Sequence, residues 1–124
     1  MNNPMIMETR LIGVDLSGSN LQGAYLNGAN MLSAKFENAI LVGVNFTGAN
    51  LCKANLVKAD LQNAILNNTN LYEADLSGSN LRGASLMGSN LGKVVMRGAV
   101  YDGSTKWPHD FNPDGHGAEF ASID

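Results

Sequence analysis

The sequence has few of the residues that build catalytic, metal-binding or disulfide-linked sites. Its 124 residues include one cysteine, Cys52, two histidines, three prolines and one tryptophan. A single cysteine cannot form a disulfide within the chain, which suits a reducing compartment. No apolar run approaches the roughly 18 residues of a membrane-spanning helix, and residues 1–10 do not read as a secretory signal. We therefore expect a cytoplasmic protein without a membrane partner.

The chain does contain a strict five-residue register. Every fifth residue from Leu11 to Tyr101 is large and apolar, and 14 of these nineteen residues are Leu. From Val14 to Ala99, the residue two places before each of them is small. Neither a helix nor a straight strand buries positions five apart on one side, whereas two residues two apart in extended chain share a face. The register therefore predicts short extended legs whose direction changes at every repeat.

The corner residues agree with this interpretation. The second residue after each large apolar position is Gly in 11 of the nineteen repeats and Asn at Asn38, Asn63 and Asn68. Gly and Asn tolerate a positive φ, so the sequence predicts type II turns at these positions. Five repeats carry other residues there, and for them we expect type I turns. These five are Ser33, Lys53, Lys58, Glu73 and Lys93.

Segments such as 24–28 (AYLNG), 54–56 (ANL) and 59–61 (ADL) match the unit A(D/N)LXX. The chain thus resembles the pentapeptide repeat family, and the match covers residues 9–103. The resemblance implies an all-β fold, a right-handed quadrilateral β-helix or solenoid with four repeats per coil and about five coils. Large and small apolar residues would fill the interior, and the other three positions of each repeat would face outward.

The resemblance and the change in composition after Tyr101 divide the chain into three parts. Residues 1–8 form a lead-in in which Met5, Ile6 and Met7 are expected to shield the first coil. Residues 9–103 form the β-helix. Residues 104–124 lose the register and form a C-terminal cap, which is similar to the closing segment of cyanobacterial pentapeptide proteins. Trp107 and Phe111 are the residues expected to cover the last coil, since open β-coils expose unpaired backbone and apolar surface.

No constellation in the sequence predicts catalysis or cofactor binding. Cys52 has no neighbouring His in the repeats, so it is interpreted as a half-exposed apolar residue rather than a reactive thiol. His109 with Asp110 and Asp114 with His116 could ligate a metal in principle, but they lie among turn-forming residues without a recognised ligand spacing. We expect no enzyme, no cofactor and no metal.

Four repeats per coil would stack residues twenty apart in columns along the outside. One column holds the apolar residues Ile12, Leu32, Cys52 and Tyr72, here called the apolar stripe. Contiguous apolar surface marks contact sites more often than scattered residues do, although a tolerated surface remains the alternative. The neighbouring column holds Asn30, Asn50, Asn70 and Asn90, for which we expect a ladder of stacked amides.

Charge separates the functions that the resemblance implies. Some family members mimic DNA and inhibit or protect type II topoisomerases, which requires a strongly acidic rod. Between Arg10 and Gly103 there are six acidic and seven basic residues, so this rod is nearly neutral. The favoured prediction is a non-enzymatic protein-interaction scaffold or regulator with an unknown protein partner. It would not bind nucleic acid directly, and it could pair with itself through an end or through the apolar stripe. The alternatives are the DNA mimic and a purely structural module.

Overall fold

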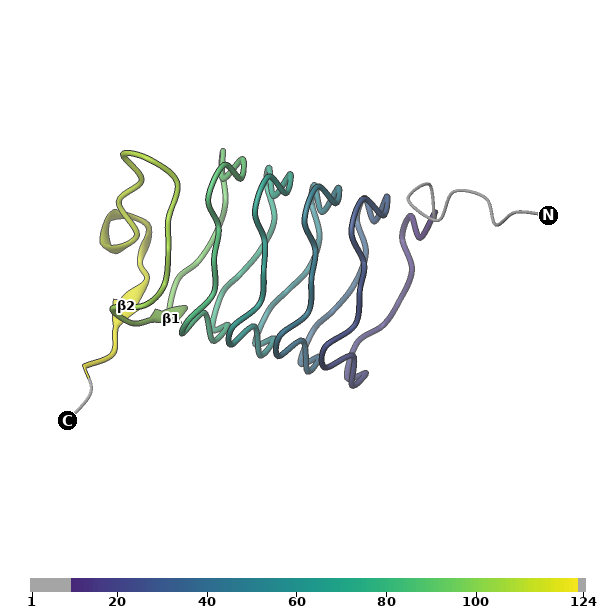
Figure 1. Ribbon diagram of the computed structural model, residues 1–124, viewed down its shortest axis with the longest axis horizontal. Coiled ribbons are helices and arrows are strands. Elements are labelled where there is room, and N and C mark those ends of the chain that lie inside the picture. Colours follow the sequence, from purple (N-terminus) through teal and green to yellow (C-terminus); the bar gives the residue numbers. More distant parts are fainter. Residues whose placement is uncertain (1–9, 123–124) are drawn as a thin grey trace.

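The computed structural model describes residues 10–122 and shows similar coils stacked along the long axis of the molecule (Figure 1). Successive coils are joined by parallel β-bridges between residues twenty apart, from Arg10↔Asn30 to Asn80↔Val100. Twenty residues hold four repeats, so each coil has four sides. The expected lead-in residues Met5, Ile6 and Met7 lie outside the described residues.

Each repeat forms one side of a coil, and we number the four faces in chain order. A repeat contains a small interior residue, a face-centre residue, a large interior residue and two corner residues, in that order. The large interior residues belong to the four faces as follows: Leu11, Met31, Leu51, Leu71 and Leu91 to the first; Leu16, Phe36, Leu56, Leu76 and Met96 to the second; Leu21, Leu41, Leu61, Leu81 and Tyr101 to the third; Leu26, Phe46, Leu66 and Leu86 to the fourth.

The interior is filled by the residues that the five-residue register predicts. Every large interior residue from Met31 to Leu86 has 0% exposure, and the small residues between them are buried with it. The four leucines of the first coil are only partly buried, because no described coil precedes them. The core is therefore a continuous apolar column, and the predicted inward orientation of the leucines is confirmed.

Backbone hydrogen bonds between neighbouring coils hold the stack together. The Leu51 amide donates to the Asn70 carbonyl at 2.8 Å, and the Lys53 amide donates to the Tyr72 carbonyl at 2.9 Å. The amide of the small residue, for example Ala54, closes the corner by donating to the large interior residue three places earlier. Because this pattern recurs in each repeat, the corners are stacked in register along the rod.

The remaining amide, at the first corner position, is bonded by a side chain in the repeats that have Asn or Asp at the face centre. Where the face-centre residue is Asn or Asp, its Oδ1 accepts from the amide two residues later, as in an Asx turn. The Cys52 amide, for example, donates to Asn50 Oδ1 at 3.0 Å. The face-centre residues that act in this way are Asp15, Asn20, Asn30, Asn45, Asn50, Asn55, Asp60, Asn70, Asp75, Asn80 and Asn90.

The expected amide ladder is limited by this local bonding. Among the described residues, one rung joins two side chains of the column, from Asn50 Nδ2 to Asn30 Oδ1 at 3.2 Å. The oxygens of Asn50, Asn70 and Asn90 accept from their own corners instead. The asparagine column is thus structural, but mainly through its corners rather than through stacked amides.

All the second corner positions from Gly13 to Gly98 have a positive φ, including the five that were expected to form type I turns. That expectation is wrong: φ is 60° at Lys53 and 59° at Lys58. The amide at this position donates to the next coil at about the same distance whether the residue is Gly, Lys or Glu. The ladder therefore imposes the left-handed conformation on residues that would otherwise avoid it.

The coil that contains Phe36 and Phe46 has an irregular interior, because two of its four large interior residues are aromatic. Both rings have 0% exposure, and their centroids lie 5.7 Å apart in an edge-to-face arrangement. Ala34, Ala39 and Ala49 are buried around them. The two rings meet across the core, so they contribute packing and leave the column filled.

The register changes by one residue after β1 (Val100–Tyr101). Ser85 pairs with Lys106, twenty-one residues later, so the corner after Tyr101 contains one extra residue. Gly103 consequently lacks the positive φ expected from its position. The Asp102 carboxylate accepts from the Gly83 amide at 3.1 Å, in the place where a carbonyl accepts in the other coils.

The tail lies next to the last coil, at the C-terminal end of the stack (Figure 1). Trp107 and Phe111 pack against the core, and their rings are stacked at 5.3 Å. The chain then forms the 3₁₀ helix η2 (Asp114–His116) and the short strand β2 (Glu119–Phe120), which pairs in parallel with β1 beside the last coil (Figure 1). Within residues 10–122 the structure contains no helix that is long and apolar enough to cross a bilayer.

Candidate interaction surface

The apolar stripe lies at the corner that follows the first face. Its residues occupy the first corner position of successive coils, and their stacking is fixed by bonds such as Ser33 N–H to the Cys52 carbonyl at 2.9 Å. Ile12 is 53% exposed, whereas Leu32, Cys52 and Tyr72 are half-buried. The structure thus brings the four residues into one continuous row.

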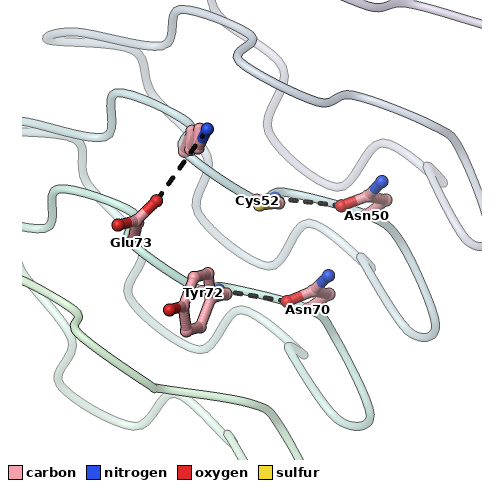
Figure 2. Close-up of polar contacts among 6 residues, drawn as sticks. Asn50, Cys52, Asn70, Tyr72 and Glu73 are labelled. Atoms are coloured by element: carbon pink, nitrogen blue, oxygen red, sulfur yellow. Dashed lines mark hydrogen bonds and ion pairs between the residues drawn. The ribbon is translucent and has the colours of Figure 1, made fainter.

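Polar residues border the stripe on both sides. Figure 2 shows Cys52 and Tyr72 one above the other, each bonded through its amide to Asn50 or Asn70. On the other side, Lys53 Nζ and Glu73 Oε1 are 3.9 Å apart on well-exposed side chains. An exposed pair at this distance contributes little to stability, so it leaves both groups available to a partner.

The stripe ends at Gly92, the next residue in the column. A Cβ at this position would lie 2.8 Å from Cδ1 of Tyr72, so the tyrosine ring covers the glycine. The absence of a side chain at Gly92 therefore lets the Tyr72 ring lie along the rod.

An aromatic cluster occupies the C-terminal end. Tyr101 contacts Trp107 and Phe120 edge-to-face at 5.4 Å, and Phe111 is stacked on His116 at 4.5 Å. The Trp107 Nε1 group is buried without a hydrogen-bond partner. The cluster joins the last repeat, the tail loop and β2 into one packed unit.

Hydrogen bonds at this end shift two ionisation equilibria. The Tyr101 hydroxyl donates to Asp114 Oδ1 at 2.6 Å, and this bond raises the pKa of Tyr101 above its usual value. The pKa of Asp102 is lowered, first by the Ser104 hydroxyl and also by the Gly83 and Ser104 amides and the Thr105 hydroxyl. Both groups therefore form hydrogen bonds within the C-terminal end of the protein.

The residues considered as metal ligands remain apart as two exposed pairs. His109 Nε2 lies 3.3 Å from Asp110 Oδ2, while Asp114 bonds Tyr101 and His116 Nδ1 lies 2.9 Å from the Asn112 carbonyl. Among residues 10–122, no three His, Cys, Asp or Glu side chains gather as a metal site would require. The geometry gives no support to metal binding here.

The fourth face is a further surface, which the stacking of outward residues in the sequence did not single out. It carries three exposed apolar side chains, Tyr25, Ile65 and Met87. The signal was present in the sequence, because every fourth repeat from 24–28 onward lacks a charged residue up to residue 88. Exposure in the structure shows which of these residues project into solvent.

Comparison with known proteins bears directly on this architecture. The family model for pentapeptide repeats matches in 8 copies, over residues 9–48, 29–68, 54–92 and 64–100. A search of curated proteins gives no match.

Two solved structures share both fold and sequence. The pentapeptide repeat protein Rfr23 from the cyanobacterium Cyanothece 51142 is 44% identical, with a TM-score of 0.75 over 76% of this chain and 64% of that one. A pentapeptide repeat protein of the Arabidopsis thaliana thylakoid lumen is 33% identical, with a TM-score of 0.72 over 73% of this chain and 63% of that one. The chain thus spans slightly less than two thirds of either relative. Its repeats and its structural relatives agree, and the chain belongs to the pentapeptide repeat family, whose members fold as right-handed quadrilateral β-helices.

Proposed function

We propose that this protein is a non-enzymatic scaffold that binds a protein partner through its outer surface. In this proposal about five coils form the rod, and the tail from residue 104 closes its C-terminal end. The main support is that the positions of each repeat differ in burial. Two positions fill the core, while the side chains at the other three face solvent and are free to vary.

The filled interior argues against catalysis by the repeats. The large interior residues from Met31 to Leu86 are fully buried and in contact, so substrate has no space within the column. A catalytic site needs convergent acid, base or nucleophile groups in a desolvated cleft. The outward residues of this rod instead stand in separate columns on convex corners and flat sides.

The apolar stripe is the proposed contact site for the partner. Ile12, Leu32, Cys52 and Tyr72 form a row without a charged residue, bordered by amides and by the Lys53–Glu73 pair. An apolar centre with a polar rim is the usual composition of a protein interface. The near-neutral rod disfavours a DNA mimic, which would have to present dense negative charge.

Quantitative capture from the native lysate with purified, immobilised protein tests this proposal. A specific partner should be retained by the unsubstituted protein and lost with the variants Leu32→Glu and Tyr72→Glu. Val57→Glu is the matched control, because Val57 is half-buried at the same repeat position on the second face. Equal capture by all four proteins would reject the stripe as the contact site.

A further inference from the structure

The fourth face is an uncharged side of an otherwise charged rod. It consists of the repeats 24–28, 44–48, 64–68 and 84–88, whose sequences are AYLNG, VNFTG, AILNN and ASLMG. All the charged residues from Arg10 to Asp102 lie on the other three faces. The next coil ends the uncharged region, because Ser85 pairs with Lys106.

Apolar side chains project from this face along its length. Tyr25 is 83% exposed in the first coil, Ile65 is 37% exposed in the third, and Met87 is 52% exposed in the fourth. Interface centres are depleted in charged residues and enriched in Tyr and Met. The face therefore has the composition of an interface centre.

Two asparagine oxygens on the uncharged face already accept hydrogen bonds from within the protein. Asn45 Oδ1 accepts from the Thr47 amide at 3.0 Å and from the Thr47 hydroxyl at 2.6 Å. Asn67 Oδ1 accepts from the Ser85 hydroxyl at 2.6 Å and from the Met87 amide at 3.1 Å. Because these acceptors are already bonded, covering them costs less than covering acceptors that bond only to water.

The backbone holds the face in a fixed, sheet-like form. Bridges join Tyr25 to Asn45, Asn45 to Ile65 and Ile65 to Ser85. Since strands in a sheet are about 4.8 Å apart, four coils give a surface roughly 15–20 Å long. A partner would meet a preformed surface and would not have to order it.

We propose that the uncharged face binds the same face of a second copy, with the two rods antiparallel. A two-fold axis between the second and third coils would place Tyr25 of one copy opposite Ser85 and Met87 of the other. The most protruding side chain then meets a small residue and a thioether, and Asn45 meets Ile65. The proposal is independent of the partner site at the apolar stripe, which lies at a different corner.

The lack of charge makes this face, rather than the three charged faces, the one suited to pairing with a second copy. In any symmetric pairing a face meets its own residues, so a charged face must either pair its charges well or bury them unpaired. The uncharged face brings no charged side chain of its repeats into the interface. Its length places it at the low end of interface sizes, below about 1,200 Å² in total, so the dimer is weak and concentration-dependent.

Sedimentation equilibrium of the purified protein, over roughly 10 μM to 1 mM, tests the proposal directly. The unsubstituted protein should shift from monomer to dimer, and Ile65→Lys should weaken association at least tenfold. Ile65→Asp should have the same effect, and an Asp here can also bond the corner amide as Asp60 and Asp75 do. Ile40→Lys is the matched control on the third face, since Ile40 is 39% exposed at the same repeat position.

Disulfide trapping tests the antiparallel register. In a Cys52→Ser background, the double variant Tyr25→Cys/Ser85→Cys should form a covalent dimer under mild oxidation, whereas Tyr25→Cys alone should form far less. A protein that stays monomeric at 1 mM, or a dimer that Ile65→Lys leaves unchanged, overturns the proposal. If Leu32→Glu dissociates the dimer and Ile65→Lys does not, the apolar stripe is the self-association site instead.

Discussion

The position of a residue in the five-residue repeat determines its burial and its backbone conformation. The sequence predicts which side chains are interior and which are exposed, because burial follows the register directly. It did not predict the left-handed corners at Ser33, Lys53 and Glu73. Local preference alone disfavours that conformation there, and the hydrogen bond to the next coil decides the outcome.

Ser79 is a buried small residue whose hydroxyl has no partner. The Ser79→Ala variant should be more stable by about 1 kcal/mol, because it removes an unpaired buried hydroxyl and leaves the residue most common at this position. Ser89→Ala is the control, since the Ser89 hydroxyl donates to the Leu86 carbonyl at 2.7 Å. Urea unfolding of both variants measures the difference, and equal effects would contradict it.

Gly43 illustrates the backbone cost of a corner. Its φ is 67°, and a Cβ would meet no atom within 4 Å. Gly43→Ala should therefore lower the unfolding free energy by about 1 kcal/mol through conformation alone. Lys58→Gly, at a non-glycine corner, should raise it by roughly 0.5–1 kcal/mol. Thermal unfolding with opposite signs for the two variants would support this account.

At the scale of structural elements, the coils were easier to predict than the end. Trp107 and Phe111 were expected to cover the last coil, and both pack against the core. The extra residue after Tyr101 was not foreseen. The five-residue register simply stops there, and a bond such as Gly83 N–H to the Asp102 carboxylate cannot be deduced from spacing.

The Asp102 carboxylate makes the end structure sensitive to acid. Its pKa lies below that of an unfolded aspartate, near 3.8, because the Ser104 and Thr105 hydroxyls and two amides bond its charged form. The stabilisation is present above this unfolded pKa and is lost as pH falls through the lower pKa of the folded state. Asp102→Ala should thus lower stability at pH 7 and show a smaller further loss below pH ~4. Chemical unfolding at several pH values measures both effects, and parallel curves would exclude the role assigned to Asp102.

The coil with two phenylalanines should be the most sensitive to truncation. Phe36→Ala removes a fully buried ring that contacts Phe46, so it should cost about 3–5 kcal/mol through lost burial and the cavity left behind. Leu61→Ala provides a comparison in the following coil. An unfolding midpoint unchanged by Phe36→Ala would show that the ring is not in the core.

At the scale of the whole molecule, stability comes from contacts between adjacent coils. Each coil bonds only to the coils before and after it, as the bridges between residues twenty apart show. Such a stack behaves as a one-dimensional array in which repeat and interface contributions add. Family membership and architecture followed from the sequence for this reason, whereas partner choice depends on outward residues that the fold leaves unconstrained.

Deletion of residues 50–69 tests this additivity. The deletion joins Ala49 to Asn70, which keeps the five-residue register and removes one complete coil. The shortened protein should fold with its faces still aligned, and its urea m-value should fall in proportion to the lost surface. Deletion of residues 54–58 alone should be more damaging, because all later repeats would turn onto a neighbouring face. Circular dichroism and urea titration of both proteins distinguish the cases.

The Asx turns show which hydrogen bond is missing where the face-centre residue is apolar. Tyr25, Ile40, Ile65 and Val95 stand at face centres, where Asn or Asp would bond the nearby corner amide. Loss of such a capping oxygen typically lowers the unfolding free energy by about 1 kcal/mol. Each of these four positions therefore has an exposed apolar side chain at a cost in local stability. Asparagine at all four positions would give a more stable rod, because it would bond the corner amides. Each of the four side chains instead exposes apolar surface that a contacting molecule would cover.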